Sequence, residues 1–197
     1  MTKIAIVTGS VRPGRQSLNV ATWVKSIADQ RSDAEFEVVD LADFELPVWD
    51  EALPPSYGPG AKAHSKAWSA RMDEFDGYVF VVSEYNHSIT GALKNALDYL
   101  SPELHNKAAG FVSYGSAGGA RAVEHLRGIL SEMQVAHVRN GVLLSIFTDF
   151  ENFSILAPTE PATAAVQPML DQLVVWTKAM EAVRAGRFAP VDADAVA

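Results

Sequence analysis

Short, fully apolar runs alternate along this chain with segments whose apolar residues recur every three or four positions. Residues 4–7 and 78–82 are runs of the first kind, and most of their side chains are β-branched or aromatic. A run that is apolar on both faces predicts a strand buried on both sides, as in a parallel sheet covered by helices. The alternation therefore predicts an α/β domain in which right-handed crossovers place helices on both faces of the sheet.

Five strands and five helices follow from this pattern. The expected strands are residues 4–7, 36–41, 78–82, 108–114, and a fifth at 135–138 that resumes at 142–146. The expected helices are residues 18–28, with Ser17 as N-cap, and residues 61–75, 89–100, 120–130 and 161–185. A proline-rich stretch, residues 46–60, is expected to be a long connection, and long connections are often functional.

Length and composition narrow the class of protein. The 197 residues suit one domain, which we assign to residues 1–186, with residues 187–197 as a frayed tail. A net charge of -8 would repel a nucleic-acid backbone. No apolar run is long enough to span a bilayer and no signal-peptide pattern is present, so we expect a cytoplasmic protein without a membrane partner. The absence of cysteine excludes disulfides, thiolate metal sites and cysteine nucleophiles.

The loop after the first strand, residues 9–19, carries groups that bind anions. It leads into a helix N-terminus, whose backbone N–H groups and dipole attract a phosphate. Ser10, Ser17 and Asn19 can donate further hydrogen bonds, and Arg12 a charge-assisted one. The alternative is a polar turn in which Ser17 is only a helix cap.

Two common phosphate-binding loops do not fit this segment. A dinucleotide-binding fingerprint needs glycine where Val11 stands. A triphosphate-binding loop needs Lys followed by Ser or Thr after Gly14, where this chain has Arg15 and Gln16. The loop therefore favours a monophosphate.

Two further polar loops follow the third and fourth strands. In residues 83–91, the Tyr85 ring could lie against a planar ligand whose polar edge meets peptide groups near Asn86. Glu84 could instead brace this loop. Residues 115–120 include three glycines, which allow either close approach to a flat ligand or a simple tight turn. Carboxyl ends of parallel strands share one edge of the sheet, so the three loops are expected to meet there.

Taken together, these loops resemble the NADPH-dependent FMN reductase family, whose members share a flavodoxin-like fold. The resemblance is carried by Gly9-Ser10-x-Arg12 with Ser17 and Asn19, by Glu84-Tyr85-Asn86-x-Ser88 with Gly91-x-Leu93-Lys94-Asn95-Ala96, and by Gly115-Ser116-x-Gly118-Gly119. It implies a three-layer sandwich with a five-stranded parallel sheet. One departure is Ser83, which stands where the family commonly has proline.

The resemblance also implies roles for individual residues. Those around the flavin phosphate would be Ser10, Arg12, Ser17 and Asn19. Those facing the isoalloxazine and ribityl portion would be Glu84, Tyr85, Asn86 and Ser88, with Ser116 and Gly118 closing the other side.

The activity implied is that of an FMN-dependent oxidoreductase. NADPH or NADH would reduce the bound FMN, and a small acceptor such as a quinone, free flavin, azo compound or metal oxyanion would then take the electrons by a ping-pong mechanism. The flavin carries the chemistry, so no catalytic residue and no metal are expected. The five histidines are dispersed in the sequence, and whether His87 contacts a substrate or only solvent stays open.

A homodimer or homotetramer is implied. The alternative is an FMN-binding electron-transfer or redox-sensing module that acts through a protein partner.

Overall fold

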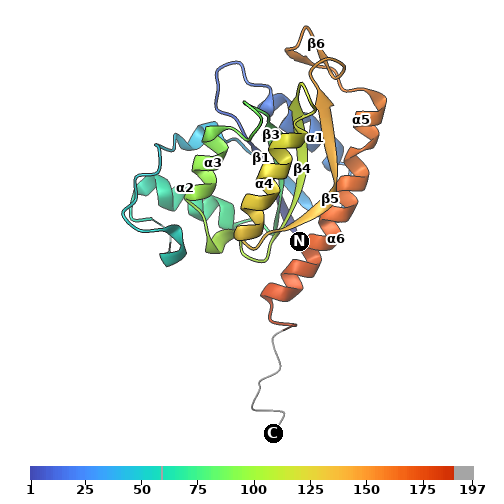
Figure 1. Cartoon of the computed structure of the whole chain (residues 1–197). Coiled ribbons are helices and arrows are strands. Elements are labelled where there is room, and N and C mark those ends of the chain that lie inside the picture. The colour runs from blue at the N-terminus through green and yellow to red at the C-terminus, as the bar shows by residue number, and fades with distance from the viewer. Residues whose placement is uncertain (59, 189–197) are drawn as a thin grey trace.

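The computed structural model describes residues 1–58 and 60–188 of the chain. Its centre is a five-stranded parallel sheet in the order β2-β1-β3-β4-β5, which confirms the flavodoxin-like class (Figure 1). The strands are β1 (Lys3–Thr8), β2 (Glu35–Val39), β3 (Gly77–Ser83), β4 (Ala108–Gly115) and β5 (Ala136–Ser145). The order reverses between β1 and β3, which is where ligands bind in sheets of this kind.

Helices cover both faces of the sheet and complete the three layers (Figure 1). The helices α1 (Ser17–Ala28) and α6 (Val166–Arg184) pack on one face. The short helix α5 (Glu160–Ala164) comes directly before α6. The other face is covered by α2 (Ala63–Asp73), α3 (Gly91–Asp98) and α4 (Ala120–Glu132).

Each face of the sheet has its own hydrophobic core. Along β1, Ile4 and Ile6 belong to the core beneath α1 and α6, whereas Ala5 and Val7 belong to the core beneath α2, α3 and α4. Successive side chains of a strand point to opposite faces, so an uninterrupted apolar run supplies both cores at once. This is the physical basis of the fully buried strands expected from the sequence.

The long C-terminal helix expected over residues 161–185 is two helices. The first ends at Ala164 and the second begins at Val166. Pro168 explains the break, because it has no N–H to donate to the carbonyl four residues earlier, and its ring collides with that carbonyl. The expectation of one continuous helix was therefore wrong.

Local polar groups shift other element boundaries. The second strand ends at Val39 and not at residue 41, because the Asp40 side chain accepts the Ala42 N–H (3.1 Å) and starts the short helix η1 (Leu41–Phe44). Thr90 likewise caps α3 by accepting the Leu93 N–H at 3.0 Å. The predicted helix over residues 61–75 is the shorter α2.

Residues 46–60 form the expected long connection. Among its described residues the only regular element is the short helix η2 (Pro55–Tyr57). Asn95 of α3 holds its first part, donating to Pro47 O (2.7 Å) and accepting the Trp49 N–H (2.8 Å). The Tyr99 hydroxyl adds a bond to the Asp50 carboxylate at 3.0 Å. Burial and the Asp50 charge raise the pKa of Tyr99 to about 12.

The fifth strand is continuous but irregular. Ala109 pairs with His137 and Phe111 with Gly141, so a bulge in β5 lies opposite Gly110. The interruption expected between residues 138 and 142 is this bulge. Another short helix, η3 (Pro102–Leu104), precedes β4.

A hairpin absent from the sequence prediction follows β5. It consists of β6 (Phe150–Glu151) and β7 (Ile155–Leu156) and projects beyond the sheet at the top of Figure 1. Buried Asp149 anchors it by accepting the N–H groups of Ser145 and Thr159, both at 2.9 Å. Burial raises the pKa of Asp149, but its hydrogen bonds lower the pKa by more than burial raises it. The carboxylate is therefore ionised at neutral pH.

The described chain ends shortly after α6. Of the tail expected at residues 187–197, all but the first two residues lie outside the described part. Within residues 1–58 and 60–188, no helix is long and apolar enough to cross a bilayer.

Candidate functional site

The loops after β1, β3 and β4 meet at the carboxyl edge of the sheet, toward the top of Figure 1. Two contacts join the first loop to the second. The buried Ser10 hydroxyl lies 2.9 Å from Tyr85 Oη, and Arg12 Nε donates to the same oxygen at 3.1 Å. The structure thus brings together residues that are more than 70 positions apart in the sequence.

Ser17 is the first residue of α1 and not its N-cap, which corrects the sequence prediction. Gln16 occupies the cap position in a helical conformation, and no side chain caps the helix. The buried Ser17 hydroxyl donates to Ser10 O at 3.2 Å and so joins the helix to the loop. Because this bond occupies its proton, the hydroxyl offers an incoming anion only its lone pairs.

The N-terminus of α1 is open to an anion. Its first turn contains no acidic residue, and no capping side chain competes for its backbone N–H groups. Asn19 is exposed on this turn, where its Nδ2 donates to Gln16 Oε1 at 2.9 Å. An exposed bond of this kind exchanges easily with a ligand.

The two arginines of the first loop have different environments. Arg15 is paired with the Asp40 carboxylate, which also accepts the Thr8 hydroxyl at 2.8 Å. Burial opposes ionisation of Asp40, but these partners lower its pKa below the ordinary value. Arg12 is exposed and, within the described residues, pairs with no carboxylate. Arg12 is therefore the guanidinium available to a bound anion.

The second loop contains a tight turn closed at both ends. Tyr85 N donates to Ser88 O (2.9 Å) and Ser88 N to Tyr85 O (3.1 Å). Asn86 (φ 48°) and His87 (φ 73°) occupy left-handed conformations between them. This turn holds Tyr85 at the surface with 37% of its area exposed, where its hydroxyl contacts the first loop.

Glu84 braces the second loop against α4. Its carboxylate is paired with Arg121 and accepts the N–H groups of Arg121 (3.2 Å) and Ala122 (3.4 Å) at the start of that helix. Burial opposes ionisation, but Arg121 and these N–H groups outweigh it and lower the Glu84 pKa. The side chain therefore performs the bracing role that the sequence left open.

Ser83 stands where the resemblance leads one to expect proline. It is buried at the end of β3, and its hydroxyl donates to Tyr114 Oη at 2.5 Å. Burial raises the pKa of Tyr114, which the Ser83 bond partly opposes. A cross-strand hydrogen bond thus restrains the loop where the family's proline would restrict the backbone.

The third loop curls tightly under the same edge. Gly118 and Gly119 have positive φ, 65° and 77°, and a Cβ on Gly119 would come within 2.6 Å of Ser113 Cβ. The Ser113 hydroxyl fixes the curl by donating to Gly118 O at 2.7 Å. Ser116 is exposed at the tip, so the tip presents backbone and one small hydroxyl to a flat ligand.

Three residues of this site escaped the sequence analysis. Thr90 had a usable signal, since a threonine before a helical pattern is a common N-cap. Arg121 and His125 lie four positions apart on α4, so they share the helix face that meets the second loop. Nothing in the local pattern indicates their partners, Glu84 and Ser88, which are 37 positions away in each case.

The histidines are not all dispersed in space. His125 Nδ1 lies 2.9 Å from Ser88 Oγ, and the rings of His87 and His125 are 6.0 Å apart between centroids. The fold therefore brings together two histidines that are 38 positions apart in the sequence. Among the residues that the structure describes, no three His, Asp or Glu side chains are grouped to hold a metal ion.

Comparison with known proteins identifies the family. The family model described as NADPH-dependent FMN reductase matches residues 2–149. The chain belongs to this family. It is 40% identical over 165 residues to an NAD(P)H-dependent FMN reductase of Nectria sp, covering 79% of this chain and 81% of that protein. It is 36% identical over 137 residues to a quinone reductase of Escherichia coli, covering 65% and 70% respectively. Membership confirms an oxidoreductase that uses FMN and NAD(P)H.

Solved structures agree with the fold. A flavoenzyme NAD(P)H:(acceptor) oxidoreductase from Paracoccus denitrificans superposes with a TM-score of 0.71 at 18% identity, covering 91% of this chain and 99% of the other. The geometry of this chain fits FMN independently of that likeness. The uncapped helix N-terminus, the exposed Arg12 and Tyr85, and the curl at Gly118 and Gly119 are surroundings that suit a phosphate and a flat ring.

Proposed function

We propose that this member of the family reduces small acceptors, quinones foremost, in two separate stages. Free flavin, azo compounds and metal oxyanions are further acceptors that the same chemistry can serve. The observation that carries the proposal is the open anion site at α1 directly beside the exposed Tyr85 turn. The Escherichia coli relative, named a quinone reductase, supports the choice of acceptor.

In this proposal each loop holds one part of the cofactor. The phosphate lies at the N-terminus of α1, held by Arg12, Ser10 and Asn19, with Ser17 contributing its backbone N–H. The flavin ring and ribityl chain lie along the second loop, against Tyr85, Asn86 and Ser88 and the backbone of Glu84. Ser116 and Gly118 close the other side.

When bound, FMN accepts a hydride from NAD(P)H and passes two electrons to the acceptor. The residues of this chain bind and orient it, and the exposed Tyr85 turn leaves one side accessible. We propose that the oxidised nicotinamide leaves before the acceptor enters the same space. Ping-pong kinetics follow, with parallel lines in double-reciprocal plots at different acceptor concentrations.

Anaerobic stopped-flow measurement tests this function. Mixing the FMN-loaded protein with NADPH, and separately with NADH, should bleach the flavin absorbance, and menadione should then restore it. A flavin that reduced nicotinamide does not bleach would overturn the reductase proposal. It would favour the alternative of an electron-transfer or redox-sensing module, whose docking to a basic partner the net charge of -8 would assist.

The proposal includes a homodimer or homotetramer in the cytoplasm. The long connection exposes Val48, Trp49, Leu53 and Tyr57, and the hairpin region exposes Phe147 and Phe153. Apolar groups on this scale are unusual on an isolated domain and suit contact with another subunit or a planar ligand. Light scattering of the FMN-loaded protein measures the assembly directly, and a monomer would contradict this part.

A further inference from the structure

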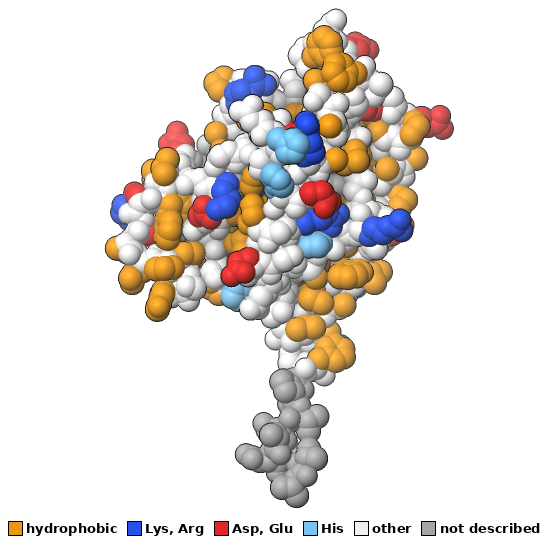
Figure 2. All heavy atoms as spheres, viewed as in Figure 1, with side chains coloured by type: hydrophobic (Ala, Val, Ile, Leu, Met, Phe, Trp, Pro, Cys, Tyr) orange, Lys and Arg blue, Asp and Glu red, His pale blue; other side chains and the backbone are white. Residues whose placement is uncertain are grey.

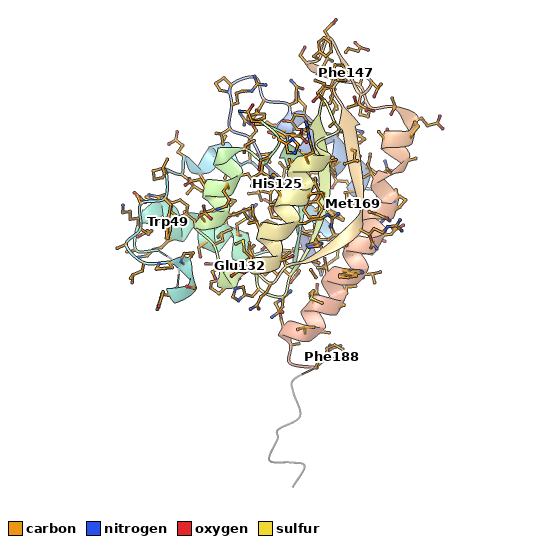
Figure 3. All side chains as sticks on the ribbon, in the orientation of Figure 1. Trp49, His125, Glu132, Phe147, Met169 and Phe188 are labelled. Carbon is orange, nitrogen blue, oxygen red and sulfur yellow. The ribbon has the colours of Figure 1, made fainter. Side chains whose placement is uncertain are left out.

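Two histidines lie side by side where the second loop meets α4. The His125 ring is fixed by Ser88, whose Oγ lies 2.9 Å from Nδ1. The His87 ring is inclined at 50° to it, with 6.0 Å between centroids, and both side chains are exposed. Figure 3 labels His125 on the half of α4 nearer the three loops, and Figure 2 shows histidine side chains at the surface there.

The second loop and α4, which carry the two histidines, set the distance between their rings. His87 occupies a left-handed position in the turn closed by two Tyr85–Ser88 backbone bonds. Glu84, one residue before that turn, is bonded to Arg121 and so ties the loop to the first turn of α4. Both rings are therefore carried by elements that are bonded to each other.

Ion pairing is the next property of the two histidines that bears on their role. Within the described residues neither ring is ion-paired with a carboxylate, whereas His64 contacts Asp50 at 3.1 Å. Of the charged residues that flank His125 on α4, Arg121 is paired with Glu84, and Glu124 lies 3.5 Å from Arg127. The ring nitrogens that these contacts leave unused can therefore form hydrogen bonds with a ligand.

We propose that His87 and His125 form a subsite that binds a carbonyl oxygen of a quinone and supplies the proton needed for its reduction. This inference rests on the proposed function and deepens it. It makes His125 the proton donor and His87 a second hydrogen-bond donor to the quinone oxygen, where the second loop and α4 border the proposed flavin.

The proton balance defines what the pair must do. A quinone that receives one hydride, which carries two electrons, needs one further proton to become a neutral hydroquinone. The donor is the imidazolium form of His125, in which Nδ1–H donates to Ser88 Oγ and Nε2 carries the proton that is transferred. The N–H bond at Nε2 breaks as the O–H bond of the hydroquinone forms, which leaves a neutral ring with its remaining proton on Nδ1, and the ring then recovers a proton from the solvent.

Variants of the pair, tested with two acceptors, separate proton supply from electron transfer. His125→Gln, His87→Gln and the double variant would be mixed anaerobically with NADPH and then with menadione or ferricyanide. Ferricyanide takes one electron and no proton. We expect menadione reduction to fall about tenfold in each single variant and about a hundredfold in the double variant, with ferricyanide reduction unchanged. His105→Gln, whose ring is near Ser101 and outside this corner, is the matched control.

The pH profile adds a readout that a structural role would not change. Because the proposed donor is an imidazolium, menadione reduction by the wild type should fall as the pH rises. The double variant should lose this dependence. Equal losses with both acceptors, or an unchanged pH profile, would overturn the inference.

Binding of 4-nitrophenolate, an analogue of a hydroquinone anion, is measured without turnover. Equilibrium dialysis with the oxidised, FMN-loaded protein should show about tenfold weaker binding in each single variant, the loss of one charge-assisted hydrogen bond. Unchanged binding would overturn the inference. If the wild type were not reduced by NADPH or NADH, the proposed function would fail by itself, and this dialysis would still decide whether the pair is an oxyanion site.

Discussion

At the scale of single residues, the two arginines of the first loop show how position decides role. Both lie within five residues of Ser17, where the uncapped helix α1 begins, and both carry the same charge. Arg15 is partly buried against Asp40, where it neutralises a carboxylate. Within the described residues Arg12 pairs with no carboxylate and its guanidinium contacts the neutral Tyr85 side chain, so its charge is available to a ligand.

Removing Arg12 should therefore weaken phosphate binding selectively. We expect Arg12→Ala to raise the FMN dissociation constant about tenfold, since about 1.4 kcal/mol is a reasonable value for one charge-assisted bond. Binding of riboflavin, which lacks the phosphate, should stay the same. Fluorescence titration of the apoprotein with each flavin measures both constants.

Arg15→Ala is the matched control for this prediction. It leaves Asp40 without its cation and should lower the free energy of unfolding, with no selective loss of FMN over riboflavin. If Arg12→Ala weakened both flavins alike, Arg12 would not be a phosphate ligand.

At the scale of elements, the site depends on how α4 is attached to the end of β3. The left-handed Gly119 starts α4 without a capping side chain of its own. The Glu84 carboxylate accepts the backbone N–H groups of Arg121 and Ala122 in the first turn of α4, and it also pairs with the Arg121 side chain. A carboxylate from another element thus caps α4 and complements its dipole.

Glu84→Gln should destabilise the protein in a pH-dependent way. At neutral pH we expect the free energy of unfolding to fall by about 2 kcal/mol, the value of a hydrogen-bonded charged group. The folded pKa of Glu84 is lowered, so its contribution is complete above the unfolded pKa, at about pH 5 and higher, and is lost as pH falls through the folded pKa.

Urea denaturation of the wild type and Glu84→Gln at several pH values measures this difference. The gap between them should narrow as the solution is acidified below about pH 4. A gap that stayed constant or widened in acid would show that the Glu84 charge does not stabilise α4.

At the scale of the whole molecule, one edge of the sheet collects the functional groups while two separate cores supply stability. The three loops contribute few residues to these cores, and much of their surface is exposed. A ligand that binds the folded loops and not the unfolded chain must therefore stabilise the entire domain by mass action.

FMN should accordingly raise the thermal unfolding midpoint of the apoprotein. At a free concentration of about one hundred times its dissociation constant, FMN should add about 2.7 kcal/mol to the free energy of unfolding. Scanning calorimetry of the apoprotein with and without FMN tests this, with adenosine monophosphate as a phosphate control that lacks the flavin ring. An unchanged midpoint with saturating FMN would contradict a site formed by the folded loops.

The sequence by itself determined the alternation of strands and helices, the parallel sheet and the three loops at its edge. These depend on local periodicity and on the rule that parallel strands end together, so residues such as Ile4 and Val7 suffice to indicate them. Only the tertiary structure decided that Arg15 is paired with Asp40, that Glu84 caps α4 and that His125 lies beside His87. Each of these contacts joins residues 25 to 38 positions apart. Such contacts depend on how the helices pack on the sheet, for which a local pattern contains no information.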